Sequence, residues 1–258
     1  MDLHLNEFAT VSAYTAYIEG SYLKPNVSHI IDGDIMKYQK DAPIPPSEQY
    51  LTFEALEDGT FQLSDAVDYS LDNGATWATL AANTASPTVA SGSTIMWKAE
   101  KTSSIGTFSS TGSFNVKGNI MSLLYGDNFI GQTDLKNIYN VFNRTFVNSK
   151  VVSAGNLVLP AITLTQGCYM QMFYNCTSLT TAPELPATTL VKDCYQFMLG
   201  SCSSLNYIKM LATDISASGC LSYWVEEVTA PGTFVKAAGV TLPTGGNGIP
   251  SGWTVIEV

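Results

Sequence analysis

The sequence has few charged side chains, and basic ones are the scarcest. Only 13% of its 258 residues are charged, and 12 Lys and Arg stand against 22 Asp and Glu, which gives a net charge of -10. The basic residues are scattered singly along the chain. Nucleic-acid binding requires clustered Lys and Arg, and docking on anionic lipid requires a basic surface. The composition therefore argues against both partners.

Long apolar runs are also missing. A membrane-spanning helix needs about 20 mostly apolar residues in succession, and no segment approaches that length. We therefore expect no insertion into a membrane. Residues 1–7 (MDLHLNE) do not have the basic region and apolar core of a signal peptide. Either a signal has been removed from the chain or the protein does not use the general secretory route.

Histidine is nearly absent. His4 and His29 are the only two, and neither lies beside a nucleophile motif. This argues against nucleophilic catalysis, in which a base must activate Ser or Cys. A catalytic carboxylate pair stays open, but Asp65, Asp68 and Asp72 lie in a turn-rich strand region where carboxylates are normally solvated. We expect no enzyme activity, no catalytic residue and no cofactor.

The first 49 residues have mixed polarity and are assigned to an anchoring or attachment segment. Residues 25–31 and 35–38 predict two short strands, and Asp32-Gly33-Asp34 between them predicts a hairpin turn. The same triplet offers oxygen ligands for calcium, but a plain turn is the favoured interpretation. Residues 42–47 (APIPPS) predict a stiff, non-helical linker.

Residues 50–118 alternate between apolar and polar positions, as β-strands do. Leu51, Phe53 and Ala55 fall on one face of the first predicted strand. Further strands are expected around residues 61–63, 67–69, 76–78, 95–97 and 114–116. Because turn residues separate these strands at short intervals, the region predicts a small antiparallel β-sandwich or barrel.

A repeat starts near residue 119. The segment LPAITL at 159–164 returns as LPATTL at 185–190, an offset of 26 residues (185 − 159). The same offset relates the cysteines within two series, Cys168–Cys194–Cys220 and Cys176–Cys202. A fixed period of this length indicates a solenoid, in which each coil buries its apolar face against the next coil. We expect a leucine-rich-type solenoid over residues 119–228.

Each coil is expected to contain one strand and one helical or irregular turn. Aromatic and Met residues recur at three- and four-residue spacing over 167–175 and 193–201, which predicts the helical turns. Strands are expected at 179–182 and 205–208, and residues 229–258 predict a β cap over the end of the stack. The predicted fold is mainly β with short helices: an N-terminal β-hairpin segment, a small antiparallel β-sandwich, and a C-terminal leucine-rich-type solenoid with a β cap.

Residues 70–77 (SLDNGATW) match the Asp-box pattern of sialidase propellers. In sialidases these boxes recur several times and lie away from the active site, whereas this chain has one. Physically the box is a turn in which Asp bonds backbone donors, Gly takes a positive φ and Trp packs underneath. We interpret Ser70, Asp72, Gly74 and Trp77 as a structural turn rather than as a glycosidase marker.

The five cysteines are Cys168, Cys176, Cys194, Cys202 and Cys220. They lack the short spacing of a zinc site and no histidine accompanies them, so we expect no metal. Their period predicts thiols stacked in the core, coil upon coil. Coils about 4.8 Å apart would also permit a disulfide in an oxidising compartment. Because the count is odd, a monomer keeps at least one free thiol.

The repeated segments resemble the BspA-like leucine-rich repeat family. The resemblance is carried by the paired LPAxTL segments, by Cys-Tyr at 168–169 and 194–195, by CTSL and CSSL at 176–179 and 202–205, and by GIPSGW at 248–253. It covers residues 119–258, and residues 50–112 resemble the β-module that often precedes such repeats. The family occurs in gut Bacteroidetes and their phages, and it implies surface display and adhesion rather than catalysis.

Two functional hypotheses follow, with a carbohydrate-active enzyme as a third that depends on the single Asp box. In the first, the chain is a phage virion fibre or decoration protein on the particle surface. Its N-terminal segment would bind other virion proteins, and its repeat region would bind a host cell-surface protein or glycan. In the second, it is a bacterial cell-surface adhesin that binds host protein or polysaccharide. The lack of a signal in residues 1–7 favours the first, since virions assemble in the host cytoplasm.

Two further expectations concern assembly and binding. Fibres are commonly symmetric, so the analogy predicts a homo-oligomer. Exposed tyrosines are good anchors for protein or sugar, and Tyr174 and Tyr207 are the candidates for a binding face.

Overall fold

The computed structural model describes residues 6–8, 28–31, 34–37, 45–229 and 231–258. The chain divides into two compact units, Met1–Ile44 and Pro45–Val258. In the first unit, β2 (Ser28–Ile31) and β3 (Asp34–Lys37) pair antiparallel as predicted, and β1 (Asn6–Phe8) adds a parallel strand beside β2. The Asp32-Gly33 turn, His4 and residues 42–44 of the predicted linker lie outside the described residues.

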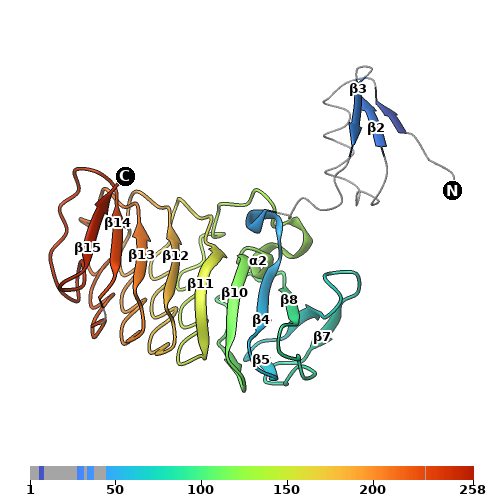
Figure 1. The fold of residues 1–258 in the computed structure, drawn as a ribbon, viewed down its shortest axis with the longest axis horizontal. Coiled ribbons are helices and arrows are strands. Elements are labelled where there is room, and N and C mark those ends of the chain that lie inside the picture. Colours follow the sequence, from blue (N-terminus) through green and yellow to red (C-terminus); the bar gives the residue numbers. More distant parts are fainter. Residues whose placement is uncertain (1–5, 9–27, 32–33, 38–44, 230) are drawn as a thin grey trace. The chain divides into compact units, whose positions relative to one another are not determined.

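The second unit is organised around one mixed sheet of ten strands, in the order β15-β14-β13-β12-β11-β10-β4-β8-β6-β7 (Figure 1). Its antiparallel part consists of β4 (Leu51–Ala55), β6 (Val67–Ser70), β7 (Ala78–Leu80), β8 (Thr94–Lys98) and β10 (Phe114–Asn119). From β10 onward the strands are parallel: β11 (Val151–Val158), β12 (Thr181–Leu185), β13 (Tyr207–Met210), β14 (Thr233–Lys236) and β15 (Thr254–Glu257). The prediction of a mainly β protein is confirmed.

Short helical elements flank the sheet. They are η1 (Pro46–Glu48), α2 (Ser122–Tyr125) and η2 (Gly126–Asn128). The Ser122 hydroxyl fixes α2 to the sheet, because it accepts a hydrogen bond from the Leu51 N–H (3.0 Å) and donates one to the Trp97 carbonyl (2.9 Å).

The antiparallel part packs on a second, two-stranded sheet. This sheet pairs β5 (Phe61–Leu63) with β9 (Phe108–Ser110). The predicted inner face of β4 is fully buried, and its Phe53 ring lies 5.3 Å from the Phe61 ring and 4.9 Å from the Phe108 ring. The strand predicted at 76–78 starts at residue 78 instead, because hydrogen bonds to Asp72 and Ser70 hold residues 72–76 in a turn.

Strand β10 joins the antiparallel and parallel parts of the sheet. It runs antiparallel to β4 and parallel to β11. The core is continuous across this junction, since the Phe146 ring lies 5.8 Å from both Phe53 and Phe108 and 5.2 Å from Phe173. Residues 50–118 and the repeat region therefore share one sheet and one core.

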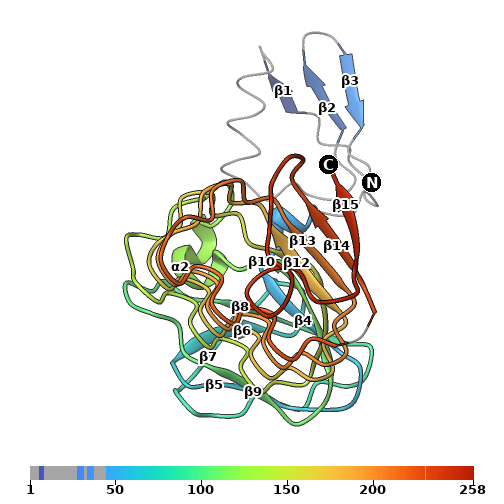
Figure 2. The same cartoon turned by 90° about the vertical axis from the view of Figure 1, so that its left-hand side faces the viewer.

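Away from the strands, successive coils are joined by a regular ladder of backbone hydrogen bonds. Every second N–H donates to the next coil, as from Tyr169 to the Cys194 carbonyl (3.0 Å). The alternate N–H groups donate three residues back within their own coil, as from Met170 to Gly167 (3.0 Å). Figure 2 shows these coils one behind another. The ladder satisfies backbone groups that irregular loops would otherwise leave to water.

The helical turns predicted at 167–175 and 193–201 are wrong. Every fourth residue there has a positive φ, for example 54° at Gln171 and 54° at Phe197. Left-handed residues interrupt a helix, so the segments fold as consecutive turns whose free N–H groups point to the next coil. The strands start at 181 and 207, two residues later than predicted, because Leu179 and Leu205 close turns onto Cys176 and Cys202.

The last two strands extend the same sheet. Thr233 of β14 pairs with Tyr207 of β13, again 26 residues apart (233 − 207), whereas Thr254 of β15 follows Thr233 by only 21 (254 − 233). The coil ladder ends on residues 246–248. There the Val225 N–H donates to the Gly246 carbonyl (3.1 Å), and the Trp224 indole N–H donates to the Gly248 carbonyl (2.8 Å).

Candidate functional site

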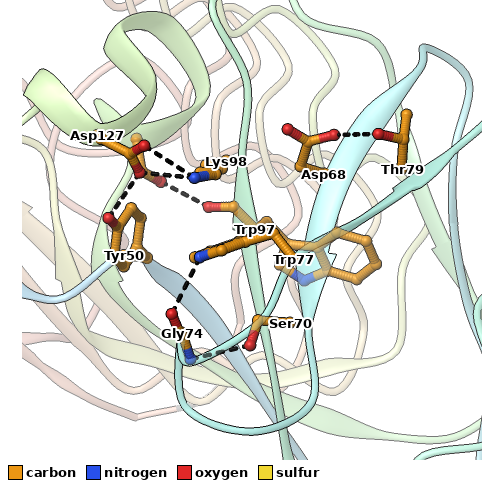
Figure 3. Close-up of polar contacts among 10 residues, drawn as sticks. Tyr50, Asp68, Ser70, Gly74, Trp77, Thr79, Trp97, Lys98 and Asp127 are labelled. Atoms are coloured by element: carbon orange, nitrogen blue, oxygen red, sulfur yellow. Dashed lines mark hydrogen bonds and ion pairs between the residues drawn. The ribbon is translucent and has the colours of Figure 1, made fainter.

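The Asp-box residues form a closed turn between β6 and β7, and Figure 3 shows Ser70, Gly74 and Trp77 of this turn. The Asp72 carboxylate accepts hydrogen bonds from the Thr76 N–H (2.8 Å), the Thr76 hydroxyl (2.6 Å) and the Ser70 hydroxyl (2.7 Å). Gly74 has a φ of 86°, and its N–H donates to the Ser70 hydroxyl (2.8 Å). The bonds from Thr76, and then that from Ser70, lower the pKa of Asp72 to about 2. At neutral pH this carboxylate is ionised and already accepts hydrogen bonds from Thr76 and Ser70, which suits a structural turn better than an acid catalyst.

A polar and aromatic cluster lies beside this turn. The Trp77 indole N–H donates to the Gly74 carbonyl (3.1 Å), and the Lys98 ammonium lies 4.3 Å from the centre of the Trp77 ring. Lys98 also donates to both oxygens of Asp127 (2.7 and 2.9 Å), and the Tyr50 hydroxyl donates to Asp127 as well (2.8 Å). The bonds from Lys98, and then that from Tyr50, lower the pKa of Asp127. The cluster ties η2 to the sheet (Figure 3).

Sequence reasoning missed this cluster. Asp68 and Lys98 are register partners on β6 and β8, and the Thr79 hydroxyl of β7 donates to Asp68 (2.6 Å). The pairing of the strands brings these side chains together, and no local sequence motif predicts this arrangement. Asp65 is likewise occupied, by Lys101 (3.4 Å) and by the Gly106 N–H (3.0 Å). All three carboxylates weighed as candidate acids thus meet donors from the protein itself.

The five cysteines are buried free thiols. Cys176 and Cys202 donate hydrogen bonds to the carbonyls of Phe146 (2.9 Å) and Phe173 (3.1 Å). Burial raises the pKa of Cys176 to about 11 and that of Cys194 to about 12. Such thiols are poor nucleophiles at neutral pH. Among the described residues, no three His, Cys, Asp or Glu side chains are placed to share a metal ion.

The two candidate tyrosines lie on different sides of the coil. Tyr174 belongs to the turn side, where its ring covers Gly200 and meets the Phe197 ring edge-on at 5.8 Å. Phe197 in turn stacks on Tyr223, with the ring centres 5.0 Å apart, so the three rings pack against one another. Tyr207 stands on β13 between Thr181 and Thr233, with 37% of its surface exposed. Tyr174 thus lies in a turn segment and Tyr207 in a strand, and the binding face stays a prediction.

Comparison with known proteins adds no relative. No family model matches the chain, and neither a curated protein nor a solved structure matches it. In the described part of the chain, no helix has the length and apolar character needed to cross a membrane.

Proposed function

We propose that the chain is a non-enzymatic structural and binding protein, and that it serves as a phage virion fibre or decoration protein. The observation that carries this proposal is the backbone ladder between corresponding segments of successive coils. Stacked coils of this kind make an extended scaffold that displays side chains from several repeats on one surface. Such a scaffold suits attachment to a host-surface protein or glycan.

The proposal gives each region a part. Residues 119–228 act as a leucine-rich-type solenoid of the BspA-like kind, and residues 229–258 act as its cap. The bonds that end the ladder on Gly246 and Gly248 support the cap assignment. Residues 50–118 act as a small sandwich module at the other end of the stack, and residues 1–49 attach the protein to other virion proteins. By analogy with fibres, the assembly is a homo-oligomer.

A non-catalytic role is supported by the state of the polar candidates. Asp72 and Asp127 accept hydrogen bonds within the protein on both carboxylate oxygens, and Asp68 accepts one on a single oxygen. Structural turns and inter-strand ties need this arrangement, whereas a general acid must be free to reach a substrate.

The alternative is a bacterial cell-surface adhesin that binds host protein or polysaccharide. It is supported by the same repeated LPAxTL segments, since the family that they resemble implies adhesion. The two proposals share the scaffold and differ in where the protein is displayed.

Mass spectrometry of purified phage particles and of washed cell envelopes from the source culture separates them. The tryptic peptide of residues 137–144 (NIYNVFNR) is a convenient reporter. We expect it in particles at the copy number of a structural protein. Its presence in envelopes alone would overturn the virion proposal and leave the adhesin. Hydrolysis of model glycosides by the purified protein would overturn the non-enzymatic part of both.

A further inference from the structure

Between Ser153 and Leu159, the coil of β11 has two residues more than the matching stretch of the next coil, from Thr181 to Leu185. Ser153 pairs with Thr181, 28 residues on (181 − 153), yet the LPAITL segment that follows returns after only 26. The register with β10 also shifts twice, between Phe114 and Asn115 and between Asn115 and Lys117. One of these shifts lies within the longer stretch, between Ser153 and Asn156, so β11 bulges at Ala154 and Gly155, of which Gly155 is exposed. Bulges of this kind often lie beside functional sites.

The two strands come close at the bulge. A Cβ on Gly155 would come within 2.9 Å of the Thr181 methyl carbon, so a larger residue there would displace the Thr181 side chain. Across the gap, β12 contains Pro183, which has no N–H for the ladder. Ser153 and Thr181 are accordingly the one register pair between β11 and β12, both of which lie within the described residues.

A pocket of about 390 Å³ opens where the two strands separate. Its walls are mostly apolar and include Leu159, Pro160 and Ile162 from one coil and Pro186 from the next. The volume lies within the range of natural ligand pockets. Ile162 is 61% exposed at the rim, at the position that Thr188 occupies one repeat later. A large exposed apolar residue beside a pocket is a feature of binding surfaces.

The charged group of the pocket is the Glu184 carboxylate. The Glu184 carboxylate is bonded through Oε2 to Lys209 (2.9 Å), and no hydrogen bond from a described residue ends on its Oε1. Its side chain is 50% exposed. The two prolines have no N–H, and the chain as a whole carries a net charge of -10. Apolar walls with a carboxylate at the rim complement an apolar group that has a cation next to it.

We propose that this pocket binds a protein segment by inserting one apolar side chain, with an adjacent Lys or Arg of the segment at Glu184. A sugar fits less well, because the lining of the pocket contains no aromatic side chain. The pocket would serve a virion protein and an adhesin alike, so its test is independent of where the protein is displayed.

The test is NMR titration of the isotope-labelled full chain with three capped dipeptides: Ac-Phe-Arg-NH2, Ac-Phe-Gln-NH2 and Ac-Ser-Arg-NH2. We expect Ac-Phe-Arg-NH2 to shift the amides of Gly155, Asn156 and Ile162. Ac-Phe-Gln-NH2 should bind about five-fold more weakly for want of the ion pair, and Ac-Ser-Arg-NH2 at least about ten-fold more weakly for want of the apolar contact.

Two variants and one matched control test whether the dipeptide binds in this pocket. Ile162→Ser should weaken Ac-Phe-Arg-NH2 several-fold, while Thr188→Ser, the matched position one repeat on, should leave it unchanged. Glu184→Gln should abolish the preference for Arg over Gln. Both Ile162 and Glu184 are exposed, so these variants are expected to fold. Equal binding of all three dipeptides, no shift up to their solubility limit, shifts elsewhere, or the same shifts from an oligosaccharide or from self-association alone would overturn the proposal.

Discussion

The two parts of the ten-stranded sheet are held together in different ways. In the antiparallel part, side chains bond much of the connecting backbone, as when the Ser86 hydroxyl accepts from the Phe61 N–H (3.0 Å) and Ser122 accepts from Leu51 (3.0 Å). In the parallel part, backbone bonds to backbone from coil to coil, as from Tyr195 to Cys220 (3.0 Å). The first part depends on particular residues at particular places, and the second depends on a constant spacing.

The difference extends to the core. In the antiparallel part, rings from both sheets meet at steep angles, such as 79° between Phe53 and Phe108. In the coils, some rings of neighbouring coils stack nearly parallel, with 5° between Phe142 and Tyr169 and 14° between Phe146 and Phe173. Repetition puts like side chains above one another, so a single substitution in a column affects two neighbouring coils.

The largest effect is expected from breaking the core where the two parts meet. Phe146→Ala removes a ring that contacts Phe53, Phe108 and Phe173, and it should lower the free energy of unfolding by about 3–5 kcal/mol. Tyr174→Ala, on the half-buried turn side, should cost about 1 kcal/mol. Urea denaturation followed by tryptophan fluorescence measures both. A loss of stability for Phe146→Ala no larger than that for Tyr174→Ala would contradict a core shared by the two parts.

Backbone strain at the junction strand should have the next largest effect. Gly118 of β10 has a φ of 81°, and a Cβ there would lie 2.1 Å from the Tyr50 carbonyl oxygen. Gly118→Ala should therefore cost about 2–4 kcal/mol. Gly131→Ala is the matched control, because Gly131 has a φ of 77° but no atom within 4 Å of the added carbon, so only about 1–2 kcal/mol is expected. Denaturation of both variants would test this difference, and equal costs would contradict it.

A smaller, pH-dependent effect is expected at the Asp-box turn. Because the folded-state pKa of Asp72 is about 2 against an ordinary 3.8, its contribution to stability is present above about pH 4 and is lost as the pH falls through about 2. Asp72→Asn should therefore lower the melting temperature at neutral pH, and the gap to the unsubstituted protein should close in acid. Thr76→Val, which removes one of the bonds, should reproduce part of the gap. A gap independent of pH would contradict this role of the carboxylate.

The smallest effect is expected on the thiols of the coils. At about pH 8 the native protein should react slowly with a thiol reagent, because burial raises the pKa values of these thiols. All five should react once the protein is unfolded. Cys220, which is 4% exposed where the other four are 0% exposed, should react first in the native state. Rapid native reaction of Cys168 or Cys202 would contradict the stacked-thiol arrangement.

The sequence predicted what depends on local pattern. The inner face of β4 follows from the alternation of Leu51, Phe53 and Ala55, and the spacing of stacked residues follows from the 26-residue offset. The left-handed turns escaped it, since Gln171 and Phe197 are residue types that rarely adopt positive φ, and only the next coil's carbonyls stabilise them there.

Features of the candidate sites that depend on strand pairing also escaped it. Lys98 and Asp127 are brought together by the fold, and no sequence motif joins them. The bulge at Gly155 becomes visible only when the register with Thr181 is compared with the repeat that follows. Tyr174 and Tyr207 looked alike in sequence, yet one belongs to a turn and the other to a strand.

The central claim is that regularly spaced backbone hydrogen bonds between successive coils hold the coils together. Residue-resolved amide hydrogen exchange over 167–175 and 193–201 tests it most directly. These segments have no regular strand or helix, yet their amides should be protected about as strongly as those of β12, because each donates within its coil or to the next one. Exchange as fast as that of the exposed loop at 102–104 would contradict the account.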